Sequence, residues 1–326
     1  MNNQKIIRWG IIGCGNVTEV KSGPAYQKTK GFELIAVMRR DPLKVKDFAL
    51  RHNITKYYTN ADELINDTEV DAIYIATPPD THEYYAKKVS ESGKPCCIEK
   101  PLAPSYKESL SILESFKENK VPLFVAYYRR SLPRFKQVKS WINNHLIGEI
   151  RHINLHLNKP ANELDLSQQY NWRTDERIAT GGYFDDLASH AIDLIEFLLG
   201  NISTAYGVSV NQQGLYSAKD AVSACWLHKN GITGSGNWNF GCSKSTDRVE
   251  IFGNQGKIEF SVFEEHPLKL ITKEKQQEFI IDNPENIQLY HVRNIKEHLL
   301  GNLKHPSTGD TAVHTAWVMD KILGKI

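Results

Sequence analysis

The feature that most constrains the fold is a nearly continuous apolar run, Ile6–Ile12, which ends in two glycines separated by one residue. Short apolar runs of this kind are typical of parallel strands that are buried on both faces. The glycines allow a tight turn and let a phosphate approach backbone N–H groups at the start of the following helix. The candidate phosphate loop consists of Gly13, Cys14, Gly15, Asn16 and Val17. Thr18 takes the place of the third small residue of this fingerprint, so the match is incomplete.

The alternation of strand and helix continues to about residue 126. Apolar runs indicate strands at 32–38, 72–76, 96–99 and 123–126, and helical patterns fall between them at 42–52, 60–65, 81–92 and 105–119. Asp41 and Pro42 are typical of a helix N-cap and of the first helical position. The alternation predicts an α/β domain with a doubly wound parallel sheet over residues 1–126.

The carboxyl end of the second strand predicts which dinucleotide would bind. An NAD site usually has an acid there for the ribose 2′-hydroxyl, whereas an arginine accommodates the 2′-phosphate of NADP. This chain has Arg39 and Arg40, followed by Asp41, which the next proline makes a better helix cap. We therefore expect NADP, with NAD as the alternative. The alternative for the two arginines is that both are solvated surface residues without a role in cofactor binding.

Further candidate residues follow the ends of two later strands. Lys100, which Glu99 precedes, places one ammonium group at the carboxyl edge of the sheet, where open α/β sheets bind ligands. Thr77 and Pro78 end the preceding strand, and the successive prolines stiffen that loop. His82 lies in the first turn of the next helix, as a cofactor contact or as a surface or capping histidine. All five residues are expected at the cofactor site.

After residue 126 the pattern changes to strands joined by short turns. A helix is expected at 134–143, strands at 149–157, 205–210, 220–227, 231–238, 248–253, 257–260, 268–272 and 278–281, and helices at 287–300 and 311–323. Gly and Asn turns between strands predict hairpins. We expect residues 127–326 to form an α+β domain with a large, mainly antiparallel sheet. The final helix, near 309–323, is a candidate to pack back on the first domain.

The stretch Gly181–Gly200 predicts a helix that carries a candidate catalytic pair. Asp186 and His190 lie one turn apart, so the carboxylate can orient the imidazole and stabilise its charged form. The expected buried face is a single stripe of Leu187, Ala191, Leu194 and Leu198. The alternatives are a helix capped by Asp185 or Asp186 with an incidental histidine, or a metal site, for which no third ligand has a suitable spacing.

Four other residues are candidate contacts to a substrate rich in hydroxyl groups, namely Tyr127, Arg130, Trp172 and Arg173. For the last two, the alternative is a tryptophan packed under the sheet beside a surface arginine.

Composition narrows the class of protein. The 326 residues carry a formal net charge of +2, and no run of Lys and Arg with interleaved aromatics indicates nucleic-acid binding. Neither a signal peptide nor an apolar run long enough for a membrane span is expected. The five cysteines show no metal or redox spacing, which favours a reducing cytoplasm.

Taken together, the motifs resemble those of the Gfo/Idh/MocA oxidoreductases, which include glucose–fructose oxidoreductase, inositol dehydrogenase, 1,5-anhydrofructose reductase and dimeric dihydrodiol dehydrogenase. The resemblance covers essentially the whole chain and rests on Gly13-Cys14-Gly15, Ala76–His82, Glu99-Lys100-Pro101, Arg129–Pro133, and Gly181-Gly182 leading to Asp186–His190. Ala188 departs from it, because the family usually has Gly there. The resemblance implies that residues 1–126 form an α/β Rossmann domain and that residues 127–326 serve substrate binding and oligomerisation, with an open-faced sheet that often mediates dimer or tetramer contacts. It also implies a nicotinamide between Lys100 and the Asp186–His190 pair, with these three residues catalytic.

Hydride transfer at a carbinol carbon requires a proton to move to or from its oxygen, and a group with a pKa near neutrality does this best. We therefore expect His190 as general acid–base and Lys100 as its electrostatic partner on the same oxygen, although the proton carrier stays open. The expected function is NADP-dependent oxidation or reduction of a sugar, anhydro-sugar or polyol by a cytoplasmic homodimer or homotetramer without a metal. The alternatives are an NAD-dependent glycosidase that retains its cofactor, a trans-dihydrodiol dehydrogenase-like enzyme, and a non-catalytic nucleotide-binding sensor.

Overall fold

The computed structural model describes residues 6–326. The first five residues, part of the stretch in which we expect no signal peptide, lie outside this range. The chain forms two compact units: the first comprises residues up to Ala103 with Lys107–Ser131 and Pro284–Val313, and the second comprises Pro104–Tyr106, Leu132–Asn283 and His314–Ile326. Residues 284–313 thus belong to the first unit, although the sequence-based division at 126/127 assigns them to the second domain. The sequence-based boundary at 126/127 remains a prediction.

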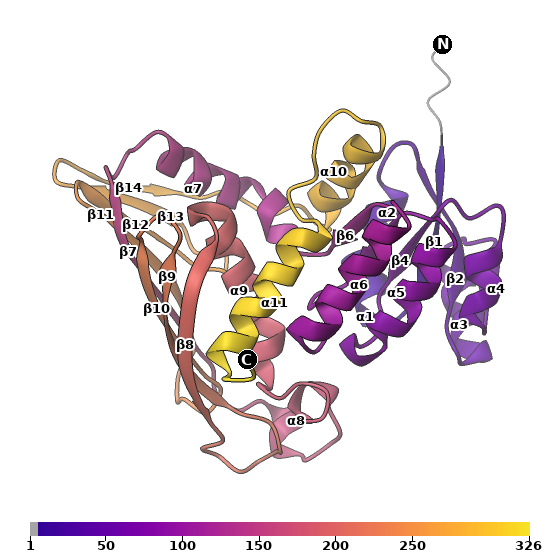
Figure 1. The fold of residues 1–326 in the computed structure, drawn as a ribbon, viewed down its shortest axis with the longest axis horizontal. Coiled ribbons are helices and arrows are strands. Elements are labelled where there is room, and N and C mark those ends of the chain that lie inside the picture. The colour runs from indigo at the N-terminus through magenta and orange to yellow at the C-terminus, as the bar shows by residue number, and fades with distance from the viewer. Residues whose placement is uncertain (1–5) are drawn as a thin grey trace. The chain divides into compact units, whose positions relative to one another are not determined.

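The first unit is built on a parallel six-stranded sheet, whose strands lie in the indigo to magenta part of the ribbon in Figure 1. Its strands are β1 (Ile7–Ile12), β2 (Phe32–Met38), β3 (Lys56–Tyr58), β4 (Ala72–Ile75), β5 (Cys96–Ile98) and β6 (Leu123–Val125). They pair in the order β3-β2-β1-β4-β5-β6, always in parallel. This is the strand order of a doubly wound Rossmann sheet, so the predicted fold is confirmed. β3 is not among the predicted strands, because one Lys and two Tyr do not form an apolar run.

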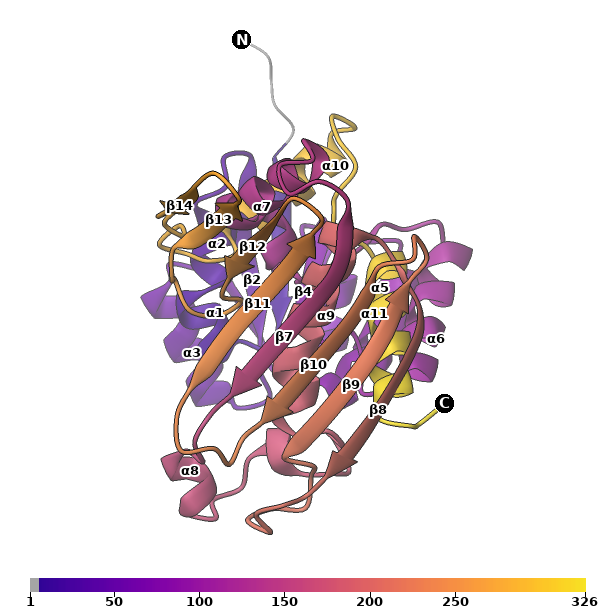
Figure 2. The ribbon, with the colours of Figure 1, turned by 90° about the vertical axis from the view of Figure 1, so that its left-hand side faces the viewer.

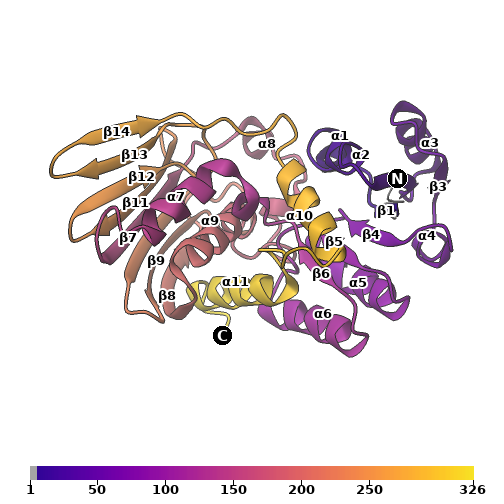
Figure 3. The ribbon, with the colours of Figure 1, turned by 90° about the horizontal axis from the view of Figure 1, so that it is seen from above.

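Helices cover both faces of this sheet. They are α1 (Asn16–Val20), α2 (Gly23–Gln27), α3 (Pro42–Arg51), α4 (Ala61–Asn66), α5 (His82–Glu91), α6 (Tyr106–Glu118) and α10 (Leu289–Leu299). In Figure 3, α1, α2 and α10 lie on one side of the strands and α5 and α6 on the other. Tyr26 of α2 and Val292 and Ile295 of α10 share one buried cluster with Trp9 of β1. The segment 284–313 therefore completes the core of the first unit.

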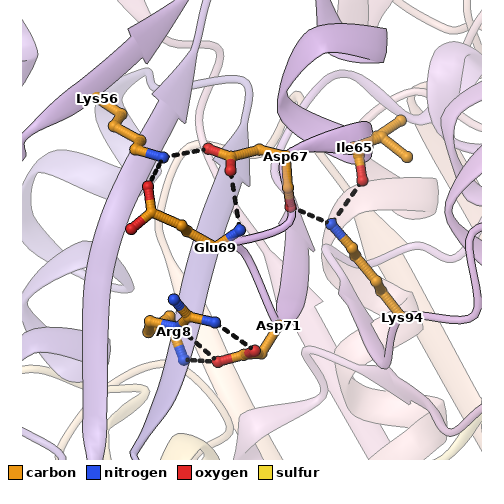
Figure 4. Close-up of polar contacts among 7 residues, drawn as sticks. All are labelled: Arg8, Lys56, Ile65, Asp67, Glu69, Asp71 and Lys94. Atoms are coloured by element: carbon orange, nitrogen blue, oxygen red, sulfur yellow. Dashed lines mark hydrogen bonds and ion pairs between the residues drawn. The ribbon is translucent and has the colours of Figure 1, made fainter.

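Charged side chains join the strands of the first unit at their amino ends, the edge opposite Lys100 (Figure 4). Arg8, near the start of β1, donates from Nε and Nη2 to the two carboxylate oxygens of Asp71, at 3.0 Å each. Lys56 Nζ lies 2.8 Å from Asp67 Oδ2. Lys94 Nζ donates to the carbonyl oxygens of Ile65 and Asp67, at the end of α4. These contacts stabilise an edge that carries none of the candidate site residues.

The second unit contains an eight-stranded sheet, which also confirms the prediction. Its strands are β7 (Ile150–Asn158), β8 (Ile202–Val210), β9 (Ala221–His228), β10 (Thr233–Asn239), β11 (Thr246–Gly253), β12 (Gly256–Phe260), β13 (Leu268–Thr272) and β14 (Gln276–Phe279). They pair in the order β14-β13-β12-β11-β7-β10-β9-β8. All pairs are antiparallel except that of β7 with β10.

One face of this sheet packs against helices, with α9 (Tyr183–Leu199) behind the strands in Figure 2. The ring of Phe184 on α9 meets Trp238 of β10 edge-on, with centroids 4.9 Å apart. The unit also contains α7 (Pro133–Asn143) and α8 (Glu163–Leu166), and the residues of α11 (Gly309–Ile322) from His314 onward. The prediction of a single buried stripe on α9 is wrong, since polar residues such as Asp193 and Glu196 are buried as well. The reason is that α9 has neighbours on several sides: Lys139 of α7 donates to Leu198 O, and α11 bonds Glu196.

No helix of residues 6–326 covers the opposite face of the sheet (Figure 2). The strand register places Tyr206 opposite Cys225 and Val208 opposite Ser223 on this face. Tyr206 and Val208 are 67% and 71% exposed. An antiparallel sheet commonly keeps one face solvated, but that face is then mostly polar. At β8 this face is therefore more apolar than the solvated face of an antiparallel sheet usually is.

Candidate functional site

The glycine loop after β1 has the shape that a dinucleotide site needs. Gly13 has φ +94°, and its N–H donates to Met38 O at 2.9 Å. A Cβ on Gly13 would lie 2.7 Å from Thr77 Cγ2 and 2.9 Å from Thr77 N, so the close contact between the two loops requires glycine. A Cβ on Gly15 would meet nothing within 4 Å. Such open space beside the backbone is what a pyrophosphate requires, so these residues fit the expected cofactor.

Two other residues of the loop are buried. The hydroxyl of Thr18 donates to Gly15 O at 2.7 Å, which satisfies it within the first turn of α1. Burial raises the pKa of the Cys14 thiol to about 11, so this cysteine stays protonated and unreactive at neutral pH. Asn16 is exposed and Val17 is half-buried at the start of α1.

The end of β2 lies against the same loop. Arg39 Nη1 donates to Cys14 O at 3.0 Å, while Arg40 is exposed. Asp41 Oδ1 accepts from the N–H groups of Lys44 and Leu43, each at 3.0 Å, and these bonds lower the pKa of Asp41. The predicted N-cap is confirmed, and this carboxylate is committed to α3.

His82 joins the loops that follow β4 and β5. It is completely buried, with Nε2 2.8 Å from Thr77 O and Nδ1 3.1 Å and 3.2 Å from the carbonyl oxygens of Leu102 and Pro101. Burial lowers the pKa of His82, and the bonds to the carbonyl oxygens oppose this shift. This geometry gives His82 a positioning role, because it holds the Thr77–Pro78 loop against the chain just after Lys100.

Glu99 is the centre of a buried hydrogen-bond network directly beside Lys100. Its Oε1 accepts from the Tyr74 hydroxyl at 2.5 Å and from Gln288 Nε2 at 2.7 Å, and its Oε2 accepts from the Lys100 N–H at 3.2 Å. Three converging donors are the partners of an ionised carboxylate. The end of β5, and with it Lys100, is thereby fixed by side chains from β4 and from the distant segment 284–313.

Neither Tyr74 nor Gln288, the two side chains that donate to Glu99, is among the candidates from the sequence. Tyr74 does leave a signal, because a tyrosine inside an otherwise aliphatic buried strand needs a partner for its hydroxyl. Gln288 leaves none, since a glutamine before a helix carries no pattern that relates it to a residue so far back along the chain.

In the second unit the structure brings Arg173 to Asp186. Arg173 Nε donates to Asp186 Oδ2 at 2.8 Å, and its guanidinium lies 4.3 Å from the centre of the Trp172 ring. All three residues are candidates from the sequence, but no spacing pattern pairs Arg173 with Asp186. His190, one turn further along α9, is 4% exposed. The pair fixes Asp186 on the helix surface that also carries His190.

The start of α9 depends on its two glycines. Gly182 has φ +64°, and a Cβ there would lie 2.4 Å from Lys219 O, so this N-cap must be glycine. Asp185 reaches back from the first turn and accepts from the Gly181 N–H at 2.9 Å. Burial raises the pKa of Asp185 to about 6. Asp185 therefore supports the start of the helix from within its first turn, but the N-cap itself is Gly182, which has no side-chain cap hydrogen bond.

The remaining candidates follow β6 in the first unit. Tyr127 is 2% exposed and Arg130 is 6% exposed, with Arg130 Nη1 donating to Pro306 O at 3.1 Å. Within the described range no three His, Cys, Asp or Glu side chains gather in a way that could hold a metal ion. Residues 6–326 also contain no helix long and apolar enough to cross a membrane.

Comparison with known proteins assigns the family. A family model described as an oxidoreductase family with an NAD-binding Rossmann fold matches residues 7–127, and the GFO/IDH/MocA C-terminal domain model matches residues 135–259. The chain is 37% identical over 322 residues to Oxidoreductase P35 of Formosa agariphila, with 98% of each chain covered.

Solved structures share the fold. A levoglucosan dehydrogenase in complex with NADH and levoglucosan superimposes with a TM-score of 0.86 at 21% identity, over 98% of this chain and 96% of that one. KijD10, a 3-ketoreductase from Actinomadura kijaniata in complex with NADP, gives 0.84 at 18% identity, over 98% and 97%. The matching family models and the 37% identical relative confirm the resemblance: the chain belongs to the Gfo/Idh/MocA family and is an NAD(P)-dependent oxidoreductase.

Proposed function

We propose that this enzyme transfers hydride between NADP and a carbinol or carbonyl carbon of a sugar, anhydro-sugar or polyol. The observation that carries the proposal is the support of Lys100 by the buried Glu99 network, together with the Arg173–Asp186 pair on the helix that carries His190. A solved neighbour that binds the anhydro-sugar levoglucosan supports the substrate class.

In this proposal His190 and Lys100 serve the same substrate oxygen. When bound, the dinucleotide supplies or takes up the hydride. His190 moves the proton of the hydroxyl, and the Lys100 ammonium donates a hydrogen bond that stabilises the developing negative charge. Asp186, held by Arg173, orients His190 or a neighbouring substrate hydroxyl.

Loss of either group tests this assignment. We expect Lys100→Ala and His190→Ala each to lower turnover by about 10²-fold or more, measured by absorbance at 340 nm over a panel of sugars and carbonyl compounds. Lys87→Ala removes a lysine that pairs with Glu83 on the surface of the first unit and serves as the control. Near-normal turnover in both active-site variants would contradict the proposal. Release of a leaving group without net reduction would favour the cofactor-retaining glycosidase instead.

Two contacts support NADP over NAD. Arg39 lies at the phosphate loop through its bond to Cys14 O, and Asp41, the acid that could hold a ribose diol, is used as a helix cap. A charge-assisted contact to a 2′-phosphate contributes about 1.5–3 kcal/mol. Arg39→Ala should therefore weaken NADP binding by about tenfold or more and leave NAD binding nearly unchanged, in a fluorescence titration. Lys44→Ala is the matched loss of a charge on α3, and equal effects of both variants would refute the assignment.

We also propose that copies of the chain associate as a dimer or tetramer through the uncovered face of the eight-stranded sheet. The exposed Tyr206 and Val208 on β8 support this surface. Val208→Lys should lower the mass measured by light scattering, whereas Leu43→Lys, at a residue 79% exposed on α3 of the first unit, should not. An unchanged mass in Val208→Lys would exclude this part of the face.

A further inference from the structure

A cavity of about 540 Å³ opens in the second unit beside the segment that carries Arg173. Its wall contains the carboxylates Asp165, Asp175 and Glu176, the amide Asn171, and the rings of Tyr170 and Tyr216. The volume lies within the range of small-molecule sites, about 300–1,000 Å³.

The lining combines the groups that recognise a ring with several hydroxyls. Carboxylates accept hydrogen bonds from hydroxyl groups, an amide both donates and accepts, and tyrosine rings offer an apolar surface beside them. Tyr170 is 74% exposed, so its ring is available to cover a ligand. This mixture suits a sugar residue better than an apolar ligand.

The charge of the lining selects against anions. Arg177 is the single base among the described residues that line the cavity, and its Nη2 lies 2.6 Å from Asp175 Oδ2. Asp165 and Glu176 are left as negative charges without a lining base to offset them. A phosphate or a uronic acid would be repelled there, whereas a neutral sugar would not.

Hydrogen bonds connect the cavity with the candidate catalytic helix. Tyr183, the first residue of α9, donates its hydroxyl to Asp165 Oδ1 at 2.6 Å and accepts from Asn171 Nδ2 at 3.0 Å. Asn171 and Thr174 both line the cavity, and Arg173 between them bonds Asp186. An occupant of the cavity would therefore touch the segment that holds Arg173 on Asp186.

We propose that this cavity binds a neutral sugar residue that is glycosidically linked to the residue being oxidised or reduced. The preferred substrate is then a neutral glycoside or oligosaccharide, and free monosaccharides and acidic sugars are poorer. This inference rests on the proposed function, because it assigns a second subsite to the same substrate.

The test compares neutral disaccharides (cellobiose, maltose, lactose and gentiobiose) with their monosaccharides and with digalacturonate. We expect at least one neutral disaccharide to exceed its monosaccharide in kcat/KM by about tenfold or more and digalacturonate to show no such gain. Tyr170→Ala and Glu176→Gln should remove most of the gain through KM. No hydrogen bond or ion pair involving the side chain of either residue is found within residues 6–326, so the fold should not suffer. Glu163→Gln, an exposed acid on α8 outside the lining, is the matched control.

The outcomes separate this inference from the proposed function. A loss of the gain in Tyr170→Ala and Glu176→Gln but not in Glu163→Gln supports the subsite. Equal kcat/KM for monosaccharides and disaccharides, or equal losses in all three variants, overturns it. If no compound is oxidised or reduced, the proposed function fails, and calorimetric binding of the same disaccharides decides about the cavity. Binding that Tyr170→Ala weakens supports the subsite in that case, and no binding overturns it.

Discussion

The hydroxyl of Tyr74 offers a direct measure of how strongly the network beside Lys100 is held. Tyr74 is completely buried and donates to Glu99 Oε1 at 2.5 Å, where Gln288 Nε2 also donates. A hydrogen bond to a charged group contributes about 1.5–3 kcal/mol, and its loss leaves a buried carboxylate less well satisfied. We therefore expect Tyr74→Phe to lower the free energy of unfolding by about 2–3 kcal/mol.

Tyr26→Phe is the matched control. Tyr26 is also completely buried, and its ring centroid lies 5.2 Å from that of Tyr74. Burial raises the pKa of its hydroxyl, and the side-chain partner of that hydroxyl is the Cys97 thiol, a weak hydrogen-bonding group. Removing a buried hydroxyl that is paired only with a thiol should change the free energy of unfolding by less than about 1 kcal/mol, or raise it.

Urea unfolding at pH 7, followed by circular dichroism, measures both variants. The midpoint should fall in Tyr74→Phe without a change in slope, whereas Tyr26→Phe should stay close to the wild type. Gln288→Met removes the second donor to the same oxygen, so the double variant with Tyr74→Phe should deviate from additivity by about 0.5–3 kcal/mol. Equal destabilisation by Tyr74→Phe and Tyr26→Phe would refute the reasoning, since the bond to Glu99 would then contribute nothing.

Three further predictions concern stability and binding. Burial raises the pKa of Asp67, but the hydrogen bonds that Asp67 accepts have the larger total effect and lower the pKa from 3.8 to about 2. The bond from Lys56 contributes most to this lowering. The carboxylate therefore stabilises the fold above pH 4, and between pH 5 and pH 3 the wild type should lose about 1 kcal/mol more than Asp67→Asn in urea unfolding. Burial lowers the pKa of His305 from 6.5 to about 4, so its neutral form is preferred in the fold. The free energy of unfolding of the wild type should therefore fall by about 2 kcal/mol between pH 7 and pH 5, because His305 must then be protonated on unfolding. In His305→Gln this pH-dependent decrease should be absent. Gly13→Ala should destabilise the fold by more than 1 kcal/mol, about the cost of a strained φ, in thermal unfolding. Gly15→Ala should spare stability but weaken dinucleotide binding, and equal melting temperatures of the two glycine variants would contradict this.

Much of the fold could be predicted because local signals agree with it. The strand Phe32–Met38 is found at its predicted bounds, and the helix after it begins at Pro42 behind the predicted cap Asp41. β3 escaped prediction because it is defined by its pairing with β2 and not by its own three residues. The single buried stripe expected on α9 failed because neighbours on several sides bury that helix, which periodicity does not reveal.

In the candidate site too, some residues could be predicted from the sequence and others could not. The glycine loop, Lys100 and the Asp186–His190 helix carry motifs, so they could be singled out from the sequence. The bonds of Arg173 to Asp186 and of Gln288 to Glu99 could not, because loops bring these residues to positions that no spacing encodes. Motifs thus predict the reactive groups, whereas the side chains that hold them come from tertiary contacts.

The late position of residues 284–313 in the chain has a consequence for protein synthesis. When the first 126 residues leave the ribosome, Glu99 still lacks the amide of Gln288, and the face of the sheet at Trp9 still lacks Val292 and Ile295. The nucleotide-binding unit can therefore reach its final packing only after most of the second unit has been translated. The first unit therefore does not fold as an independent domain ahead of residues 132–283, which are translated before its last segment.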